Sequence, residues 1–224
     1  MEREEPREQV AGGQRRPEQH ERRRDRTHDR TRRARPYNPP MDDKDARGFT
    51  AAQIDGIRAG IDHRRTTTDR SGLRGLDRVE ITVLEGLEYE ARNPHEAGVM
   101  RVGEPVARGG TGEGSSPLSL VLTGASSCLM NQFIRSSVAD GIPVRFTGVS
   151  VKGEFSRAVG GGFERISAEF RAEGTLTDEQ AQALVETAER LCYIHVTLRQ
   201  AVRMTTVLIV DGVERARSMT GPEL

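Results

Sequence analysis

Residues 116–129 read SPLSLVLTGASSCL, and this stretch decides the fold. Ser116 is a favoured N-cap residue, and Pro117 suits the first helical position, where its missing N–H would have no partner. Apolar residues then recur every three or four positions as far as Phe133, which is the spacing of one helix face. The pattern predicts a long apolar helix that ends before Gly141 and forms the centre of the domain. Cys128 lies on its apolar face.

The segment before this helix shows the pattern of strands. Apolar and polar residues alternate over residues 79–83, 87–91 and 99–102, as expected for strands with one buried face. Gly86 and the Asn93-Pro94 turn separate them. A glycine-rich loop at 109–114 leads into the helix. It lacks the Gly-Lys-Ser/Thr ending of a phosphate-binding loop, so we interpret it as a connection.

The segment after the helix repeats the scheme. Residues 149–155 and 163–172 alternate around a run of three glycines at 160–162, which predicts a hairpin. Thr177 and Gln180 have capping-box spacing and begin a second helix, whose apolar face continues to Cys192. Residues 202–210 predict a last strand. The order strands, helix, strands, helix, strand predicts an α+β fold with antiparallel sheets packed around the long central helix.

The N-terminal segment differs from the rest in composition. Residues 1–40 hold 12 Arg and 8 acidic residues, with almost no large apolar side chain before Tyr37, which predicts disorder. We divide the chain into an Arg-rich tail (1–48), an N-terminal helix and linker (49–76), a main domain (77–214) and a C-terminal tail (215–224). The helix is expected to begin after Thr50, and Met41 is an alternative start of the protein.

Composition narrows the class of function. The 34 basic and 34 acidic residues balance, and acidic residues interleave with the arginines of the tail, which argues against nucleic-acid binding. No apolar run approaches the roughly 20 residues that cross a bilayer, and no apolar signal segment opens the chain. We therefore expect a cytoplasmic protein with no membrane partner. In a reducing compartment, chemistry between the two cysteines would be transient and catalytic, or absent.

Cys128 and Cys192 are the candidate functional residues, and several interpretations are open. Free cysteines often pack as small apolar residues in a core. Each predicted helix carries one cysteine on its apolar face, so the two side chains can also meet across a shared core. A metal site would need His195 as a third ligand beside the cysteines. A serine hydrolase is disfavoured, because no Gly-x-Ser-x-Gly sequence occurs on a strand-to-helix turn.

Two motifs resemble the OsmC family of peroxide-related proteins. The spacing from Pro117 to Cys128 is similar to the family's central-helix signature "P-x-E-L-L-x-A-A-L-x-x-C". Residues 188–198, AERLCYIHVTL, resemble its second motif, "A-E-x-x-C-P-V-H-x-T-L". Residues 86–91, GLEYEA, also resemble the first hairpin of many members. The resemblance covers about residues 78–210 and includes both cysteines.

This resemblance implies an intertwined homodimer and a thiol peroxidase chemistry without a bound cofactor. Cys128 would attack an organic hydroperoxide and become a sulfenic acid, Cys192 would condense with it to a disulfide, and a dithiol reductant would reopen the bond. The alternative is a non-catalytic relative that binds an apolar small molecule or acts as a redox sensor.

The chain departs from the family pattern at the residues that activate the peroxidatic thiol. Peroxidatic members have a Glu soon after the helix-start proline and an Arg in the first hairpin. Here Leu118 and Ser119 occupy the expected place of the Glu, and Leu87 lies near that of the Arg. Arg92 and Arg101 are the nearby alternatives.

Overall fold

The structure is a computed structural model that describes residues 44–68, 76–158 and 161–222. The segment predicted to be disordered, residues 1–40, lies outside the described residues, as does residue 160 of the glycine run. Of the predicted linker, residues 69–75 also lie outside them.

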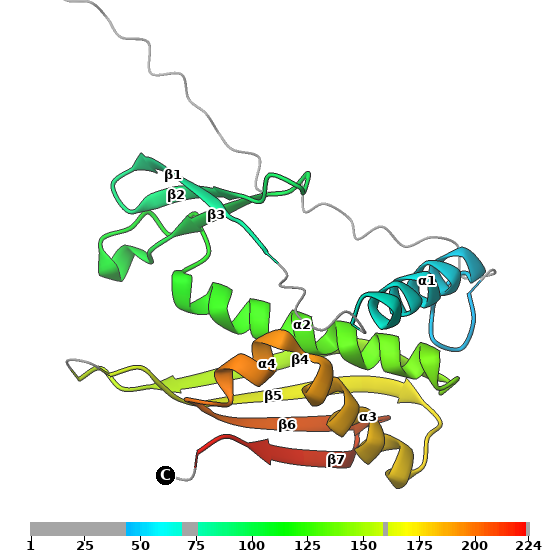
Figure 1. Cartoon of the computed structure of the whole chain (residues 1–224). Helices are drawn as coiled ribbons and strands as arrows, with labels where there is room; N and C mark the ends of the chain where they lie inside the picture. Colours follow the sequence, from blue (N-terminus) through cyan, green and yellow to red (C-terminus); the bar gives the residue numbers. More distant parts are fainter. Residues whose placement is uncertain (1–43, 69–75, 159–160, 223–224) are drawn as a thin grey trace, which may run out of the picture. The chain divides into compact units, whose positions relative to one another are not determined.

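The order of elements follows the predicted alternation of strands and helices (Figure 1). The elements are α1 (Ala51–Thr68), β1 (Glu80–Glu85), β2 (Glu88–Arg92), β3 (Val99–Gly103), the 3-10 helix η2 (Val106–Arg108), α2 (Pro117–Ala139), β4 (Val144–Phe155), β5 (Phe163–Gly174), α3 (Asp178–Leu191), α4 (Tyr193–Leu198), β6 (Arg203–Val210) and β7 (Val213–Thr220). The α+β class predicted from the sequence is confirmed.

The strands form two sheets. The first has the order β1-β2-β3 and is antiparallel throughout. The second has the order β4-β5-β6-β7, with antiparallel pairs at both ends and a parallel pair between β5 and β6. Only antiparallel pairing was predicted from the sequence. The parallel pair arises because α3 and α4 return the chain to the end of the sheet where β5 began.

The last strand, β7, was not predicted. The sequence analysis ended the main domain at residue 214, whereas β7 pairs with β6 over residues 213–220. Its only fully buried side chain is Ala216, and most of its other side chains are exposed. An edge strand with polar side chains on its faces lacks the apolar alternation that marks the inner strands.

The main core lies between the second sheet and the helices that cover one face of it, α2 and α3 (Figure 1). Phe133 of α2 is completely buried, and its ring centroid lies 4.8 Å from that of Phe170 on β5 and 5.4 Å from that of Phe146 on β4. Leu184 of α3 and Leu208 of β6 complete the centre of this cluster. The predicted apolar face of α2 is therefore the core-facing one.

The predicted capping residues begin their helices. Ser116 Oγ accepts a hydrogen bond from the main-chain N–H of Ser119 (3.2 Å) at the start of α2. Thr177 and Gln180 form both hydrogen bonds of a capping box at the start of α3. These caps satisfy N–H groups that have no partner within the helix.

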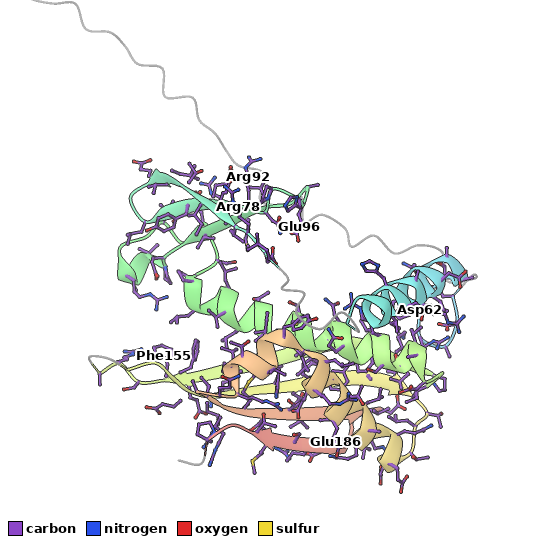
Figure 2. The ribbon with its side chains drawn as sticks, in the orientation of Figure 1. Asp62, Arg78, Arg92, Glu96, Phe155 and Glu186 are labelled. Carbon is purple, nitrogen blue, oxygen red and sulfur yellow. The ribbon has the colours of Figure 1, made fainter. Side chains whose placement is uncertain are left out.

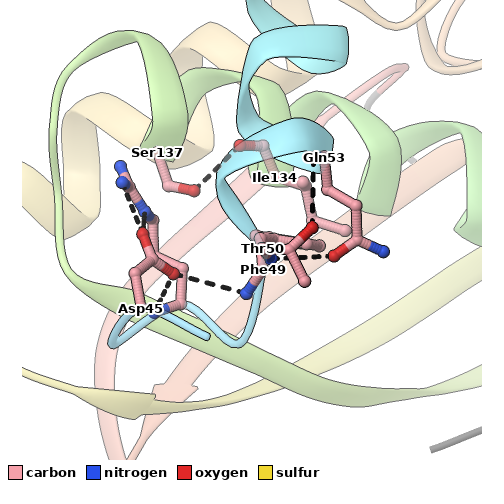
Figure 3. A network of polar contacts seen from close by, with 7 residues as sticks. Asp45, Phe49, Thr50, Gln53, Ile134 and Ser137 are labelled. Atoms are coloured by element: carbon pink, nitrogen blue, oxygen red, sulfur yellow. Dashed lines mark hydrogen bonds and ion pairs between the residues drawn. The ribbon is translucent and has the colours of Figure 1, made fainter. Parts of the chain in front are cut away.

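The turn before α1 is held by a network of polar contacts (Figure 3). The Asp45 carboxylate accepts hydrogen bonds from the main-chain N–H groups of Arg47 (2.9 Å) and Phe49 (3.3 Å) and from Arg47 Nε (2.7 Å). Thr50 caps α1 by accepting from the N–H of Gln53 (3.3 Å). The helix after Thr50 is thus confirmed, and it packs against α2.

The glycine-rich loop before α2 is fixed to the first sheet by a buried carboxylate. Glu88 Oε1 accepts a hydrogen bond from Thr111 Oγ1 (2.6 Å) and another from the Thr111 N–H (3.3 Å). Glu88 faces Gly103 across the β2–β3 pair, and a Cβ on Gly103 would overlap the carboxylate. Glycine at this position leaves room for the acid that holds the loop.

Candidate functional site

Cys128 lies in the middle of α2, and its side chain is half-buried. The residues around it on the helix are small, among them Gly124, Ala125 and Ser126. A Cβ on Gly124 would lie 3.8 Å from Ile194 Cδ1, so α4 passes close to α2 at this level. The small side chains therefore allow the short helix after Cys192 to approach the helix that carries Cys128.

Cys192 lies at a bend between α3 and α4. It has extended backbone angles (φ −85°, ψ 109°) and is the C-cap of α3 and the N-cap of α4. Its Sγ accepts a hydrogen bond from the main-chain N–H of His195 (3.4 Å). The apolar helix face predicted from the sequence extends to Cys192, and neither the bend nor α4 was predicted. The bend instead turns this sulfur to the start of α4 and toward α2.

The two sulfur atoms meet. Cys192 Sγ lies 3.1 Å from Cys128 Sγ and donates a hydrogen bond to it, and both residues are free thiols. Cys192 has no exposed surface, whereas Cys128 retains some. The proximity expected from the apolar helix faces is present in the structure, and the difference in exposure makes Cys128 the more accessible thiol of the pair.

Electrostatics keeps Cys192 in its protonated form. Burial raises the pKa of Cys192 to about 12, the main-chain N–H of His195 acts in the opposite direction, and the neighbouring Cys128 raises it further. A thiol with such a pKa is a hydrogen-bond donor at neutral pH, and it is a poor nucleophile until an acceptor removes its proton. The protonated Cys192 therefore suits the role of donor to Cys128.

A buried polar cluster lies beside Cys192. His195 Nε2 lies 2.9 Å from Thr220 Oγ1 of β7 and 3.8 Å from Glu189 Oε1 of α3. Ser218 Oγ, also from β7, donates to Glu189 Oε2 (2.8 Å). Burial lowers the pKa of His195 from its usual value, Glu189 opposes this effect, and Arg199 adds to the lowering. The imidazole is therefore neutral at pH 7.

The activating residues expected for a peroxidatic thiol have other partners or are replaced. Arg92 of β2 pairs with Glu90 (Nε to Oε1, 2.8 Å), and Arg101 of β3 lies 3.7 Å from Glu113 Oε2. Both arginine side chains are exposed; Figure 2 labels Arg92 on the first sheet. Each guanidinium therefore already has its own carboxylate.

A metal site would need Cys128, Cys192 and His195 to be arranged as ligands of one ion. Within the described ranges, no group of three or more His, Cys, Asp or Glu side chains is arranged to hold a metal ion. His195, the third ligand that such a site would require, directs Nε2 to Thr220.

The sequence of the site region matches a known family. Residues 110–207 match the family model described as OsmC-like protein. Over this segment the chain is similar to that family. This segment includes α2, both cysteines, α3, α4 and the first half of β6, so the match spans the elements that build the thiol pair.

Solved structures share the fold of this domain. A hypothetical protein from Aquifex aeolicus superposes with a TM-score of 0.54 at 15% sequence identity and covers 62% of this chain and 98% of its own. An OsmC-like protein from Mycoplasma pneumoniae gives 0.51 at 13% identity, covering 62% and 99%. An organic hydroperoxide resistance protein from Elizabethkingia anophelis gives 0.51 at 18% identity, with the same coverage.

Two further findings bear on the chain as a whole. No curated protein sequence matches it. Within the residues that the structure describes, every helix is too short or too polar to span a membrane.

Glu189 and Thr220 were not predicted from the sequence as neighbours of the site. Glu189 could have been noticed, because it is a charged residue four positions after Val185 on the inward side of an amphipathic helix. No sequence pattern indicated that Thr220 lies near the site, because the strand that carries it was not predicted.

Proposed function

We propose that this OsmC-like protein is a thiol-dependent redox protein that reduces organic hydroperoxides through Cys128 and Cys192. The observation that carries the proposal is the 3.1 Å separation of the two sulfur atoms. A disulfide has an S–S bond of about 2.05 Å, so closure requires the sulfurs to approach by only about 1 Å. The half-buried Cys128 is the thiol that an oxidant would meet first.

The proposed cycle has three balanced steps. The Cys128 thiolate attacks one peroxide oxygen, the O–O bond breaks, and the alkoxide leaves as an alcohol after taking up a proton, which gives a sulfenic acid on Cys128. Cys192 Sγ then attacks the Cys128 sulfur, and the hydroxyl leaves as water with the thiol proton of Cys192. An external dithiol reduces the disulfide by two exchange steps and is itself oxidised to a disulfide.

The hydrogen bond between the thiols supports the second step. Cys192 Sγ donates to Cys128 Sγ at 3.1 Å, which holds the two sulfur atoms in the relative position that disulfide formation needs. The two candidate arginines are paired with Glu90 and Glu113, so we expect Cys128 to react more slowly than a thiol beside a cation.

The missing activation favours one alternative, a redox sensor. Arg92 pairs with Glu90 of the first sheet, and Arg101 pairs with Glu113 of the loop before α2. A pair that oxidises slowly and remains oxidised would report peroxide without turning it over. The cavity between α2 and the second sheet measures about 10 Å³, close to the volume for a single water. The alternative of a bound apolar molecule therefore concerns the dimer interface and not this cavity.

The first sheet supports a homodimer. Ile81 and Val83 point to one face of β1 and are 66% and 64% exposed, and Met100 of β3 continues this face. A three-stranded sheet is stabilised by burying its apolar face, and an exposed apolar face marks an interaction surface. We propose that a second copy of the chain covers it.

A coupled turnover assay tests the redox proposal. The reduced protein is mixed with an alkyl hydroperoxide and a dithiol, and loss of peroxide is followed. We expect turnover that requires both cysteines, with Cys128→Ser inactive and Cys192→Ser consuming no more than one peroxide per chain. Formation of the disulfide without turnover would favour the sensor. No reaction of Cys128 under excess peroxide would refute both.

Light scattering after size-exclusion chromatography tests the dimer. The wild type is expected at twice the mass of one chain. Val83→Glu, on the proposed interface, should shift the protein to monomer, and Thr82→Glu on the opposite face of the same strand is the matched control. A monomeric wild type at micromolar concentration would refute the proposed dimer.

A further inference from the structure

The polar cluster beside Cys192 joins three elements that are separate in the chain. Glu189 lies three residues before Cys192 on α3, and His195 lies three residues after it on α4. Thr220 and Ser218, near the end of β7, contact these two side chains at 2.9 Å and 2.8 Å. The cluster therefore spans the bend at Cys192 and ties both sides of it to the edge strand.

The cluster is almost entirely enclosed. His195 is 1% exposed and Glu189 is 4% exposed. Over the described part of the chain, His195 Nδ1 and Glu189 Oε1 are buried atoms without a hydrogen-bond partner. Burying polar atoms without partners destabilises a fold, and apolar side chains of similar size would pack the same space without that loss. Such atoms indicate a purpose other than packing.

The main chain of His195 connects this cluster to the thiol. Its N–H donates to Cys192 Sγ, and the position of that N–H depends on where the first turn of α4 is held. The ring of the same residue lies 2.9 Å from Thr220 Oγ1 and 3.8 Å from Glu189 Oε1. Because the ring and the N–H belong to one residue, contacts that fix the ring also limit movement of the first turn of α4.

We propose that His195 is a positioning residue for Cys192, and that its contacts with Thr220 and Glu189 hold the His195 N–H against Cys192 Sγ while the thiol attacks Cys128. This inference rests on the proposed function of the thiol pair. When Cys192 attacks, negative charge develops on its sulfur as the proton leaves. An aligned N–H stabilises that charge, and in a buried site it acts against the unfavourable desolvation.

The attack by Cys192 can be measured without any peroxide. An aromatic disulfide reagent first reacts with the accessible Cys128, which forms a mixed disulfide and releases one coloured aromatic thiolate. Cys192 Sγ then attacks the Cys128 sulfur of the mixed disulfide, loses its proton to solvent and releases the second aromatic thiolate. The first phase reports Cys128, and the second phase reports the step that His195 is proposed to assist.

Three conservative variants test the assignment. Thr220→Val removes the hydroxyl that contacts the ring, Glu189→Gln removes the charge, and His195→Gln retains a polar side chain. The control is Thr177→Ala, which removes the cap at the far end of α3 and is expected to lower the unfolding midpoint without touching the cluster. We expect the second phase to slow by about three- to tenfold in Thr220→Val and more in His195→Gln, corresponding to about 0.6–1.4 kcal/mol for the first of these.

The outcomes separate this inference from the proposed function. Unchanged second phases in Thr220→Val and His195→Gln would overturn the positioning role. Equal slowing in the Thr177→Ala control would also overturn it, because general destabilisation would then explain the effect. If the second phase responds as expected while an alkyl hydroperoxide leaves Cys128 reduced, the positioning role stands and the hydroperoxide proposal fails.

Discussion

Oxidation of the thiol pair should stabilise the native protein, and the structure sets the size of the effect. The disulfide would join residues that are 64 positions apart. Closing a loop of that length lowers the entropy of the unfolded chain by about 14 cal/mol/K, or about 4 kcal/mol at 25 °C. The sulfurs already lie 3.1 Å apart in the reduced protein, so little native-state strain should offset this gain.

Chemical denaturation measures this difference. Wild-type protein is prepared with a phosphine reductant or after oxidation with diamide, and urea unfolding of each form is followed by circular dichroism at one protein concentration. The oxidised form is expected to be more stable by about 4 kcal/mol, which is equivalent to a rise of roughly 10 °C in Tm for a chain of this size. A Cys128→Ser, Cys192→Ser double variant is the control and should not respond to the oxidant.

One result would refute the reasoning. If the oxidised form is equally or less stable than the reduced form although mass spectrometry shows the Cys128–Cys192 bond, the bond strains the native fold. The two thiols would then not face each other in the way that the 3.1 Å contact requires.

Three other predictions concern pH and packing. Because burial raises the pKa of Cys192 from 9.0 to about 12, the reduced protein should lose stability as pH rises above 9, by about 1.4 kcal/mol at about pH 10. Urea unfolding of Cys192→Ala should lack this loss of stability. Parallel curves of unfolding free energy against pH for the two proteins would contradict the prediction. Phe133→Ala should lower the free energy of unfolding by about 3–5 kcal/mol, because its ring is fully buried against Phe170, whereas Phe155→Ala, at a half-exposed position, should cost clearly less. Thr111→Val should destabilise the protein by about 1–3 kcal/mol, since it removes the shortest hydrogen bond to the buried Glu88 carboxylate. Hydrogen exchange should show faster opening of the 109–114 loop. Protection equal to that of the wild type would contradict the role of Glu88 in fixing this loop.

The fold was predictable where local signals agree with tertiary packing. Ser116 and Pro117 marked the start of α2, and Thr177 with Gln180 marked the start of α3, because capping depends on residues close together in the chain. The alternation in β5 reflected one buried face, whereas the side chains of β1 are all exposed, so the buried face expected for that strand is not present within the described part of the chain. β7 was missed because only Ala216 is fully buried on this edge strand, and its pairing with β6 depends on the partner rather than on its own pattern.

The positions of the two thiols could be predicted from the sequence, whereas the residues around them could not. Cys128 and Cys192 lie on apolar faces that a helical repeat reveals, so their proximity followed from two amphipathic helices sharing a core. The bend at Cys192 could not be read from the sequence, since Tyr193 and Ile194 continue the helical pattern without a break signal. The contact between His195 and Thr220 joins residues 25 positions apart through an unpredicted strand, and no local rule gives such a contact.

Intact-mass analysis after one equivalent of an alkyl hydroperoxide tests the central claim most directly. The account predicts that the reduced protein loses two hydrogen atoms, that peptide mapping finds Cys128 linked to Cys192 within one chain, and that Cys192→Ser instead gains one oxygen atom on Cys128. A protein that keeps both thiols reduced under excess hydroperoxide, or that is oxidised only at methionine, would contradict it.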